Sequence, residues 1–223
     1  MQQKTAVVFG SSGLVGREVV HLLIETPEIH KIILPVRRIN DAFRSDKIRH
    51  IVVDFDNLLA SENDWKGDVY FFCLGTTMAK AKSREAFYRV DYTYTCQAAT
   101  IACRQNPNAR LLLVSSMGAD SSSVFYYSRV KGDVEKTLMA LPCAKVSVFR
   151  PSLLLGNRGE KRTGEEWAAR ISQWFSFIFT GPLKMYKPIQ ATTVAKAMVH
   201  EALKNQKGAP DVFLSRDIEQ MAS

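Results

Sequence analysis

The sequence of 223 residues has no hydrophobic run long enough to cross a bilayer, which takes about 20 consecutive apolar residues. The apolar segment at residues 6–9 is too short for the core of a signal peptide and is followed by glycines. We therefore expect a cytoplasmic protein without stable membrane insertion. Peripheral membrane contact through the aromatic run at residues 174–179 stays open.

Cysteine and histidine are scarce, and neither is grouped. Four cysteines (Cys73, Cys96, Cys103 and Cys143) form no Cys-x-x-Cys pair, and the four histidines are isolated from them and from one another. This spacing argues against a zinc site, any other metal site and a redox motif. We expect the cysteines to be buried thiols in a reducing compartment.

The chain also lacks a concentrated basic segment, although its formal charge is +8 and its isoelectric point is about 9.4. The tightest basic groups are Arg37 with Arg38, residues 44–49 and residues 80–84. No basic helix of the kind that binds nucleic acid stands out, so we expect no nucleic-acid partner. The positive charge is typical of a solvated surface that also attracts anionic phosphates.

Short apolar runs alternate with helical patterns along the first two thirds of the chain. Continuous runs of this kind are typical of strands buried on both faces of a parallel sheet. Between them, apolar residues recur at three- and four-residue spacing after residues 13, 83 and 126. The pattern predicts a doubly wound, mostly parallel α/β sheet, the Rossmann fold, as a single domain over residues 1–223. The expected strands are residues 6–9, 31–36, 51–53, 69–74, 110–115 and 145–149.

The last third has few strand signals until residues 211–214, which follow an expected helix at about 193–204. We expect residues 152–190 to form most of a small C-terminal substrate lobe over the carboxyl end of the sheet. The aromatic cluster at residues 167–179 is interpreted as the core of that lobe, with a dimer contact or a membrane contact as alternatives. The chain is expected to be a monomer or a homodimer.

A glycine-rich loop joins the first expected strand to the first helix. A pyrophosphate needs backbone N–H groups at a helix N-terminus and no side chain in its way. Gly10 permits the tight turn, Gly13 the close approach, and Gly16 the packing of the helix against the sheet. The loop therefore predicts dinucleotide binding by Gly10, Ser11, Ser12, Gly13, Leu14, Val15 and Gly16.

The ends of the next three strands indicate which cofactor binds and where its parts lie. An NAD site usually has an acidic residue after the second strand, but here Arg37 and Arg38 follow it. Arginine binds a 2′-phosphate well, so NADP is expected and NAD is less likely, with two plain surface arginines as the alternative. Asp54 and Phe55 are expected near the adenine. Leu74, Gly75 and Thr76 are expected near the cofactor's ribose. At both places the alternative is a plain turn without a cofactor contact.

Tyr127 and Lys131 lie four residues apart on one face of an expected helix. An ammonium about 4 Å from a phenol favours the phenolate by up to ~4 kcal/mol at an effective dielectric of about 20. The tyrosine can then act as general acid or base, and the lysine can also hold ribose hydroxyls. Ser116, at the end of the preceding strand, can stabilise charge on a substrate oxygen. Alternatively, the serines merely cap that strand.

Several motifs together resemble the atypical short-chain dehydrogenases/reductases, most closely the branch of the Tat-interactive proteins. The likeness covers about residues 5–200 and is most specific in residues 73–151. The motifs are Cys-Leu-Gly-Thr-Thr at 73–77, Val-Asp at 90–91, Ser-Ser-Met-Gly-Ala-Asp at 115–120, Val-Lys-Gly at 130–132 and Phe-Arg-Pro at 149–151.

The resemblance implies NADP on the glycine loop and the two arginines, catalytic roles for a serine, Tyr127 and Lys131, and Pro151 beside the nicotinamide. The chain departs from the family pattern twice. Asp91 stands where extended members often have asparagine. Ser116 is only eleven residues before Tyr127, so Ser115 competes for the catalytic role, although we favour Ser116.

We therefore expect an NADP-dependent oxidoreductase acting on a small-molecule carbonyl or alcohol, or a related epimerase or dehydratase. The alternative is a non-catalytic NADP-binding sensor or scaffold protein.

Overall fold

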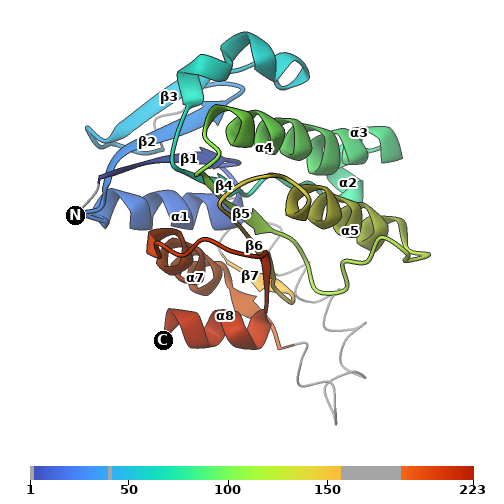
Figure 1. Ribbon diagram of the computed structural model, residues 1–223. Coiled ribbons are helices and arrows are strands. Elements are labelled where there is room, and N and C mark those ends of the chain that lie inside the picture. Colours follow the sequence, from blue (N-terminus) through green and yellow to red (C-terminus); the bar gives the residue numbers. More distant parts are fainter. Residues whose placement is uncertain (1–2, 40–41, 157–186) are drawn as a thin grey trace.

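A seven-stranded parallel sheet forms the centre of the protein (Figure 1). The computed structural model describes residues 3–39, 42–156 and 187–223. Every pairing of neighbouring strands in this sheet is parallel, which confirms the predicted fold class. In spatial order the strands are β3 (Ile48–Val52), β2 (Ile29–Val36), β1 (Lys4–Phe9), β4 (Val69–Phe72), β5 (Arg110–Val114), β6 (Lys145–Arg150) and β9 (Asp211–Leu214).

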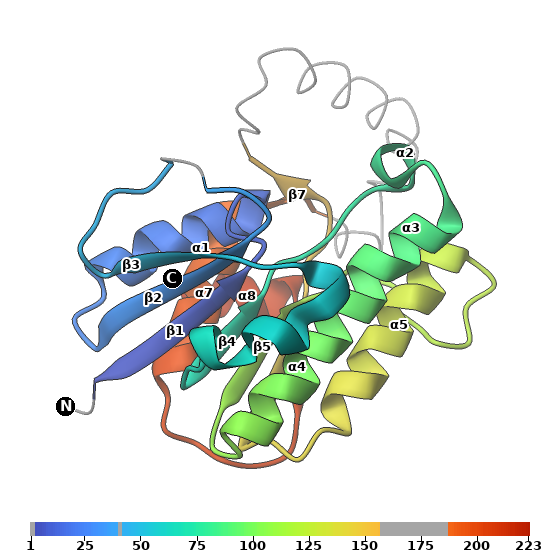
Figure 2. The ribbon, with the colours of Figure 1, turned by 90° about the horizontal axis from the view of Figure 1, so that it is seen from above.

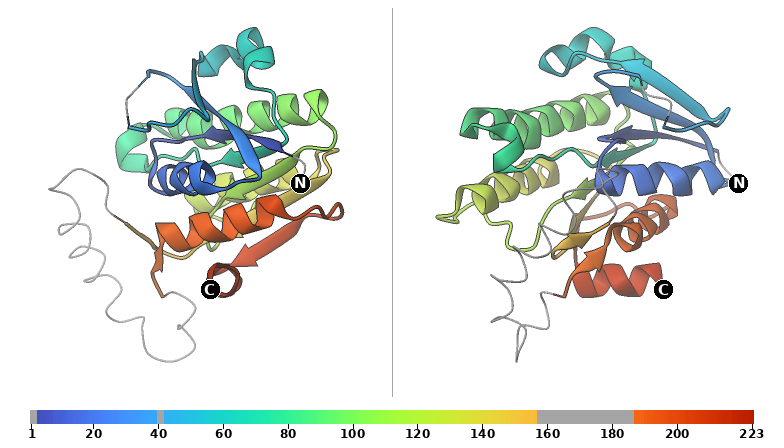
Figure 3. Two further views of the ribbon diagram at one scale, coloured as in Figure 1. Left: turned by 90° about the vertical axis from the view of Figure 1, so that its left-hand side faces the viewer. Right: turned by 180° about the vertical axis from the view of Figure 1, so that it is seen from behind.

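Helices cover both faces of the sheet (Figures 1 and 3). One face carries α1 (Leu14–Glu25), α7 (Ala191–Leu203) and α8 (Ser215–Ala222). The other carries the 3₁₀ segment η1 (Phe55–Trp65), α4 (Tyr94–Gln105) and α5 (Tyr126–Met139). The short helices α2 (Met78–Ala81) and α3 (Arg84–Tyr88) and the π turn η2 (Arg89–Thr93) lead from β4 into α4.

The central strands β1, β4 and β5 contain continuous apolar runs because both of their faces are buried. In β1, Val8 belongs to the core beneath α1 and α7, whereas Val7 belongs to the core beneath α4 and α5. All four residues of β4 are buried. A strand with one solvated face would alternate apolar with polar residues, so these runs could form only in a sheet covered on both sides.

The order of the strands changes direction between β1 and β4. The chain runs outward from β1 to β2 and β3, and then returns to β4 on the other side of β1. Ligands of open α/β sheets bind outside the carboxyl ends of the strands at this switch in direction.

Two details of the chain differ from expectation. Cys103 and Cys143 form a disulfide, so the prediction of four free thiols was wrong for this pair. The two residues are 40 positions apart, and only the packing of α4 beside the chain after α5 brings them together. Cys73 and Cys96 are free. The helix expected at about 193 begins earlier, at Ala191.

The segment predicted to form the C-terminal lobe, residues 152–190, is described only at its two ends. There β7 (Leu154–Leu155) pairs in parallel with β8 (Ile189–Gln190). Residues 157–186, including the aromatic cluster, lie outside the described residues. In the part of the chain that the structure describes, no helix is both long and apolar enough to span a membrane.

Candidate cofactor and active site

The glycine loop between β1 and α1 has no room for side chains at two of its glycines. Gly10 has a φ of +83°, and a Cβ there would lie 2.5 Å from the carbonyl oxygen of Cys73. A Cβ on Gly16 would collide with the carbonyl of Gly10. The close contact at Gly16 is therefore with the loop's own backbone, and it holds α1 close to the turn.

The N-terminus of α1 is suited to an anion. Gly13 is its N-cap and provides no side-chain cap, and no acidic residue occurs in the first turn. The N–H of Gly13 donates to the carbonyl of Gly10 (2.9 Å), which closes the turn. A turn that begins and ends with glycine, ahead of uncapped helical N–H groups, fits a dinucleotide pyrophosphate.

A cavity of about 590 Å³ opens at the switch in strand order between β1 and β4. It brings together the glycine loop, the turn after β4, Tyr127 and Lys131, which are distant in sequence. Arg17, Lys80 and Lys131 outnumber its one acid, Asp91, so the lining favours anionic ligands. The lining residues are Ser12, Gly13, Leu14, Val15, Arg17, Cys73, Leu74, Gly75, Thr76, Thr77, Met78, Lys80, Asp91, Val114, Ser115, Tyr127, Lys131 and Leu154.

Lys131 forms a buried ion pair at the base of this cavity. Its Nζ lies 2.7 Å from Oδ1 of Asp91, and both side chains are almost completely buried. The other carboxylate oxygen of Asp91 accepts the backbone N–H of Thr76 (2.9 Å). A Cβ on Gly75 would lie 3.8 Å from the ammonium. Asp91 therefore joins the turn after β4 to α5 and holds the lysine beneath Gly75.

The charge of Lys131 results from two opposing effects. Burial disfavours its ammonium, but the carboxylate of Asp91 and the nearby Tyr127 outweigh that cost and raise the pKa of Lys131 above 10.5. The lysine is consequently charged at neutral pH. Its positive charge is not isolated, however, since Asp91 offsets much of its field.

Tyr127 lies one helical turn before Lys131, at the start of α5. Its side chain is 41% exposed, and its ring packs 5.7 Å from that of Phe87. Figure 2 shows α3, which carries Phe87, beside α5. The phenol can thus reach a ligand in the cavity while its ring is held in place.

The two serines after β5 differ in their partners. The hydroxyl of Ser115 donates to Glu135 (2.5 Å), so its single proton is already used. The Oγ of Ser116 is buried and has no hydrogen-bond partner among the described residues. Ser115 lines the cavity and Ser116 does not. As the donor to a substrate oxygen, Ser115 is favoured by its place in the cavity wall. Ser116 is favoured because its hydroxyl proton is available.

Several predicted cofactor residues lie outside the cavity. Arg37 and Arg38 are exposed just beyond β2. The carboxylate of Asp54 accepts the N–H of Asp56 at the start of η1. Phe55 is buried against Phe9.

Four more predicted cofactor residues do not line the cavity. Pro151 is buried, and its carbonyl accepts the N–H of Met117 (2.9 Å). Gly10 and Gly16 shape the loop, and the neighbouring Ser11 is buried. The binding roles of these residues stay predictions.

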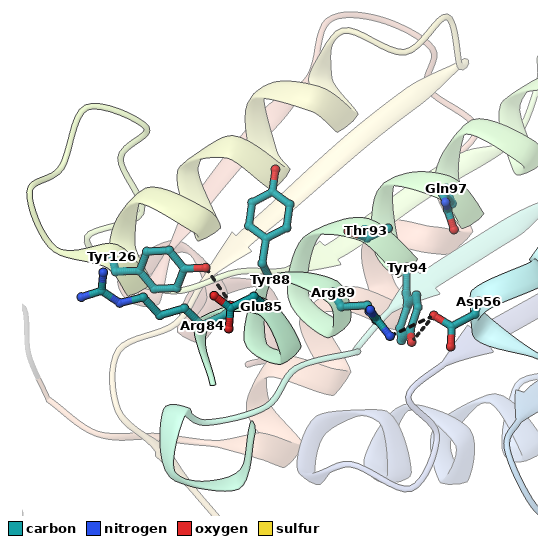
Figure 4. Close-up of a pocket in the computed structure, with 9 residues that line it drawn as sticks. All are labelled: Asp56, Arg84, Glu85, Tyr88, Arg89, Thr93, Tyr94, Gln97 and Tyr126. Carbon is teal, nitrogen blue, oxygen red and sulfur yellow. Dashed lines mark hydrogen bonds and ion pairs between the residues drawn. The ribbon is translucent and has the colours of Figure 1, made fainter. Parts of the chain in front are cut away.

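A second hollow, of about 710 Å³, lies along α3, η2 and α4 (Figure 4). None of the predicted catalytic residues lines it. Its polar groups largely satisfy one another. Asp56 accepts the hydroxyl of Tyr94 (2.8 Å) and pairs with Arg89 (3.7 Å). Tyr126 donates to the carbonyl of Arg84 (2.9 Å). Tyr127 and Lys131 line the cavity at the switch point and not this hollow.

Sequence reasoning gave no role to several residues of the site. Arg17, Met78 and Lys80 line the cavity. Glu135 contacts Ser115 and Arg150. Glu135 could have been noticed, because it is a charged residue on the apolar, sheet-facing side of α5. The positions of Met78 and Lys80 depend on α2, which has no strong sequence signal.

The fold and the glycine loop define a protein of the Rossmann class, in which a loop of this kind binds the pyrophosphate of a dinucleotide. A family model described as the NAD dependent epimerase/dehydratase family matches residues 6–215. The chain therefore belongs to that family.

Curated relatives cover nearly the whole chain. It is 34% identical over 206 residues to Protein FMP52, mitochondrial, of Candida albicans, covering 90% of this chain and 89% of the relative. It is 33% identical over 222 residues to Protein HTATIP2 of Rattus norvegicus, covering 98% and 89%. The resemblance inferred from the motifs is confirmed.

Solved structures share the fold at low identity. Human epimerase family protein SDR39U1 (isoform 2) with NADPH has a TM-score of 0.64 at 15% identity, covering 94% of this chain and 74% of that chain. The ADP-L-glycero-D-manno-heptose-6-epimerase of Helicobacter pylori has a TM-score of 0.69 at 16% identity, covering 99% and 82%. These similarities support the fold, not a particular substrate.

Proposed function

We propose that the protein is an NADP-dependent oxidoreductase that acts on a small carbonyl or alcohol, with Tyr127 as its general acid and base. The observation that carries the proposal is the single cavity lined by both the glycine loop and the Tyr127–Lys131 pair. Related epimerase or dehydratase chemistry would use the same tyrosine.

The cofactor, when bound, would accept or supply the hydride. Tyr127 exchanges a proton with the substrate oxygen, for which its partly exposed hydroxyl is suited. Lys131 keeps an ammonium beside it and can bind ribose hydroxyls. Asp91 keeps that ammonium charged and in place.

Of the two serines, Ser116 is proposed to donate to the substrate oxygen. Its buried hydroxyl lacks a partner among the described residues, and a ligand oxygen would remove that cost. Ser115 cannot donate to substrate while its proton is directed at Glu135. In a Ser116→Ala variant we expect turnover to fall about 10²-fold with NADPH affinity retained, whereas a larger loss in Ser115→Ala would reverse the assignment.

NADP is proposed over NAD because Arg37 and Arg38 occupy the strand end beside the glycine loop. In Arg37→Ala, NADPH affinity should fall about tenfold, since a charged contact to the 2′-phosphate is lost. NADH affinity should hardly change, and both can be measured by calorimetric titration. Arg44→Ala, which removes another exposed arginine of the same segment, is the control. Equal losses for the two cofactors would contradict the assignment.

The central test compares two neighbouring tyrosines. Tyr127→Phe should retain NADPH affinity within about twofold and lose turnover over a panel of carbonyl substrates by about 10²- to 10⁴-fold. Tyr126→Phe is the matched control, because Tyr126 lines the other hollow and not the cavity. A Tyr127→Phe variant as active as Tyr126→Phe would exclude Tyr127 as the acid and base.

A second candidate function is a non-catalytic NADP sensor or scaffold. The ion pair of Lys131 with Asp91 supports it, because a paired ammonium favours a tyrosinate less than an isolated one. Tight NADPH binding with no turnover by the wild-type protein on the whole panel would favour this candidate.

The cytoplasmic location, the absence of a nucleic-acid partner and a monomeric or homodimeric state stay predictions. Some relatives are named mitochondrial. Fractionation of cells that express the tagged chain would test the predicted cytoplasmic location directly.

A further inference from the structure

Glu135 is a buried acid on the same side of α5 as the proposed catalytic residues. It follows Lys131 by four residues and Tyr127 by eight, which on a helix places all three along one face. Its side chain is about as buried as that of Lys131. A carboxylate at such a position needs charged or hydrogen-bonding partners.

The partners of Glu135 come from the ends of two neighbouring strands. From just beyond β5, the hydroxyl of Ser115 donates to its Oε1 (2.5 Å). From the end of β6, Arg150 donates through Nε to both carboxylate oxygens (3.0 and 3.1 Å) and through Nη2 to Oε2 (2.5 Å). These hydrogen bonds from Arg150 to Glu135 raise the pKa of Arg150.

This network crosses the region where the catalytic residues are placed. Ser115 lines the cavity, and the residue after it is the proposed oxygen donor. Tyr127 and Lys131 precede Glu135 on its helix. A shift of α5 along the strand ends would therefore move the phenol and ammonium relative to the serines.

We propose that Glu135 is a positioning residue of the active site: by binding Ser115 and Arg150 together, its carboxylate sets the position of α5 against the ends of β5 and β6. It does not contact the substrate. The proposal rests on the proposed function in so far as Tyr127 and Lys131 do the chemistry.

The same chain contains a matched control. Glu201 on α7 is also buried, and it pairs with Arg110 (2.9 Å) and accepts the hydroxyl of Ser147 (3.3 Å). Arg110 is the first residue of β5, so this second glutamate–arginine–serine group lies at the amino end of the sheet, opposite the cavity. A purely structural role should make the two glutamates equivalent.

The experiment compares Glu135→Gln with Glu201→Gln in the ligand-free protein. Side-chain NMR signals of Tyr127 and Lys131, assigned by their loss in Tyr127→Phe and Lys131→Arg, report the geometry of the site. Both variants should melt at lower temperature than the wild type. Only Glu135→Gln should move the two signals, and only it should weaken NADPH binding, by about tenfold.

Ser115→Ala separates position from charge. It leaves the carboxylate and Arg150 in place but removes the link to β5, so the Tyr127 and Lys131 signals should still move, by less than in Glu135→Gln. Ser115→Ala also provides the test of the proposal if Glu135→Gln does not fold. Signals unchanged in Ser115→Ala, or moved equally by Glu201→Gln, would overturn the proposal.

The NMR readout requires neither cofactor nor turnover. Failure of the proposed function would appear as absent NADPH binding or an active Tyr127→Phe, with the Glu135 response intact. Failure of the positioning role would appear as unmoved signals in a protein that still binds NADPH.

Discussion

The ammonium of Lys131 and the carboxylate of Asp91 together determine the charge that the cavity presents beside Tyr127. A lysine buried to this degree would lose its proton more readily than a solvated one. Asp91 reverses that tendency at a distance of 2.7 Å. The charge beside Tyr127 therefore depends on Asp91, a residue that is not on α5.

Replacing Asp91 by asparagine should reverse the pKa shift of Lys131. Burial, the largest effect, would then no longer be opposed by the charge of Asp91, so the pKa of Lys131 should fall from above 10.5 to below it. The change can be followed by NMR titration of the lysine side chain. Asp133→Asn is the control, because Asp133 lies two residues away and does not contribute to the Lys131 shift. A value that stays raised would show that Asp91 is not the cause.

The same shift has a consequence for stability. Since the folded-state pKa of Lys131 is raised above 10.5, the stabilisation from its ion pair is fully present below that pH. It is lost as the pH rises through the higher folded value. The free energy of unfolding of the wild type should therefore fall above pH 10.5 more steeply than that of Asp91→Asn, as measured by urea denaturation across this range.

At the scale of the elements, the π turn η2 positions Asp91. It lies between α3 and α4, and Asp91 is its one buried residue. A π turn inserts an extra residue into a helix and is frequent at functional sites. The helical spacing of apolar residues predicted one helix after residue 83, and it contained no sign of this interruption.

The turn after β1 can be tested with a pair of glycines. Gly10 and Gly118 both have a φ of +83°, but only at Gly10 would a Cβ meet other atoms. Gly118→Ala should lower the free energy of unfolding by about 1 kcal/mol from backbone strain alone. Gly10→Ala should lower it by several-fold more and abolish NADPH binding. Denaturation curves and calorimetric titration measure both, and equal costs would argue against the close approach of the Cys73 carbonyl.

At the scale of the whole molecule, the disulfide links α4 to the segment between α5 and β6. Of four cysteines, only Cys73 and Cys96 are free, and burial raises the pKa of each thiol to about 12. Both should therefore react slowly with a thiol reagent at pH 8 in the native protein. Protein purified without reductant and then unfolded should show two reactive thiols, and four after reduction. Four thiols before reduction would contradict the disulfide.

Much of the fold could be predicted because its signals are local. The apolar runs of β1, β4 and β5 follow from burial on both faces, and the glycine loop follows from the steric demands of one turn. Tyr127 and Lys131 share a face for the same kind of reason, since helix geometry relates residues four apart.

The partners of these residues could not be predicted in the same way. Lys131 is 40 residues from Asp91, and Ser115 is 20 residues from Glu135. Whether such side chains meet depends on how α5 packs against η2 and the strand ends, for which no short-range pattern exists. The disulfide was missed for the same reason.

The sequence by itself determined the alternation of strands and helices, the glycine-rich loop and the tyrosine–lysine pair, because each depends on backbone geometry within a few residues. Only the tertiary structure decided that Lys131 is paired with Asp91, that the proton of Ser115 is directed to Glu135, and that the hollow along α3, η2 and α4 is not lined by the predicted catalytic residues. Those outcomes depend on burial and charge at contacts between elements, and burial exists only once the elements have packed.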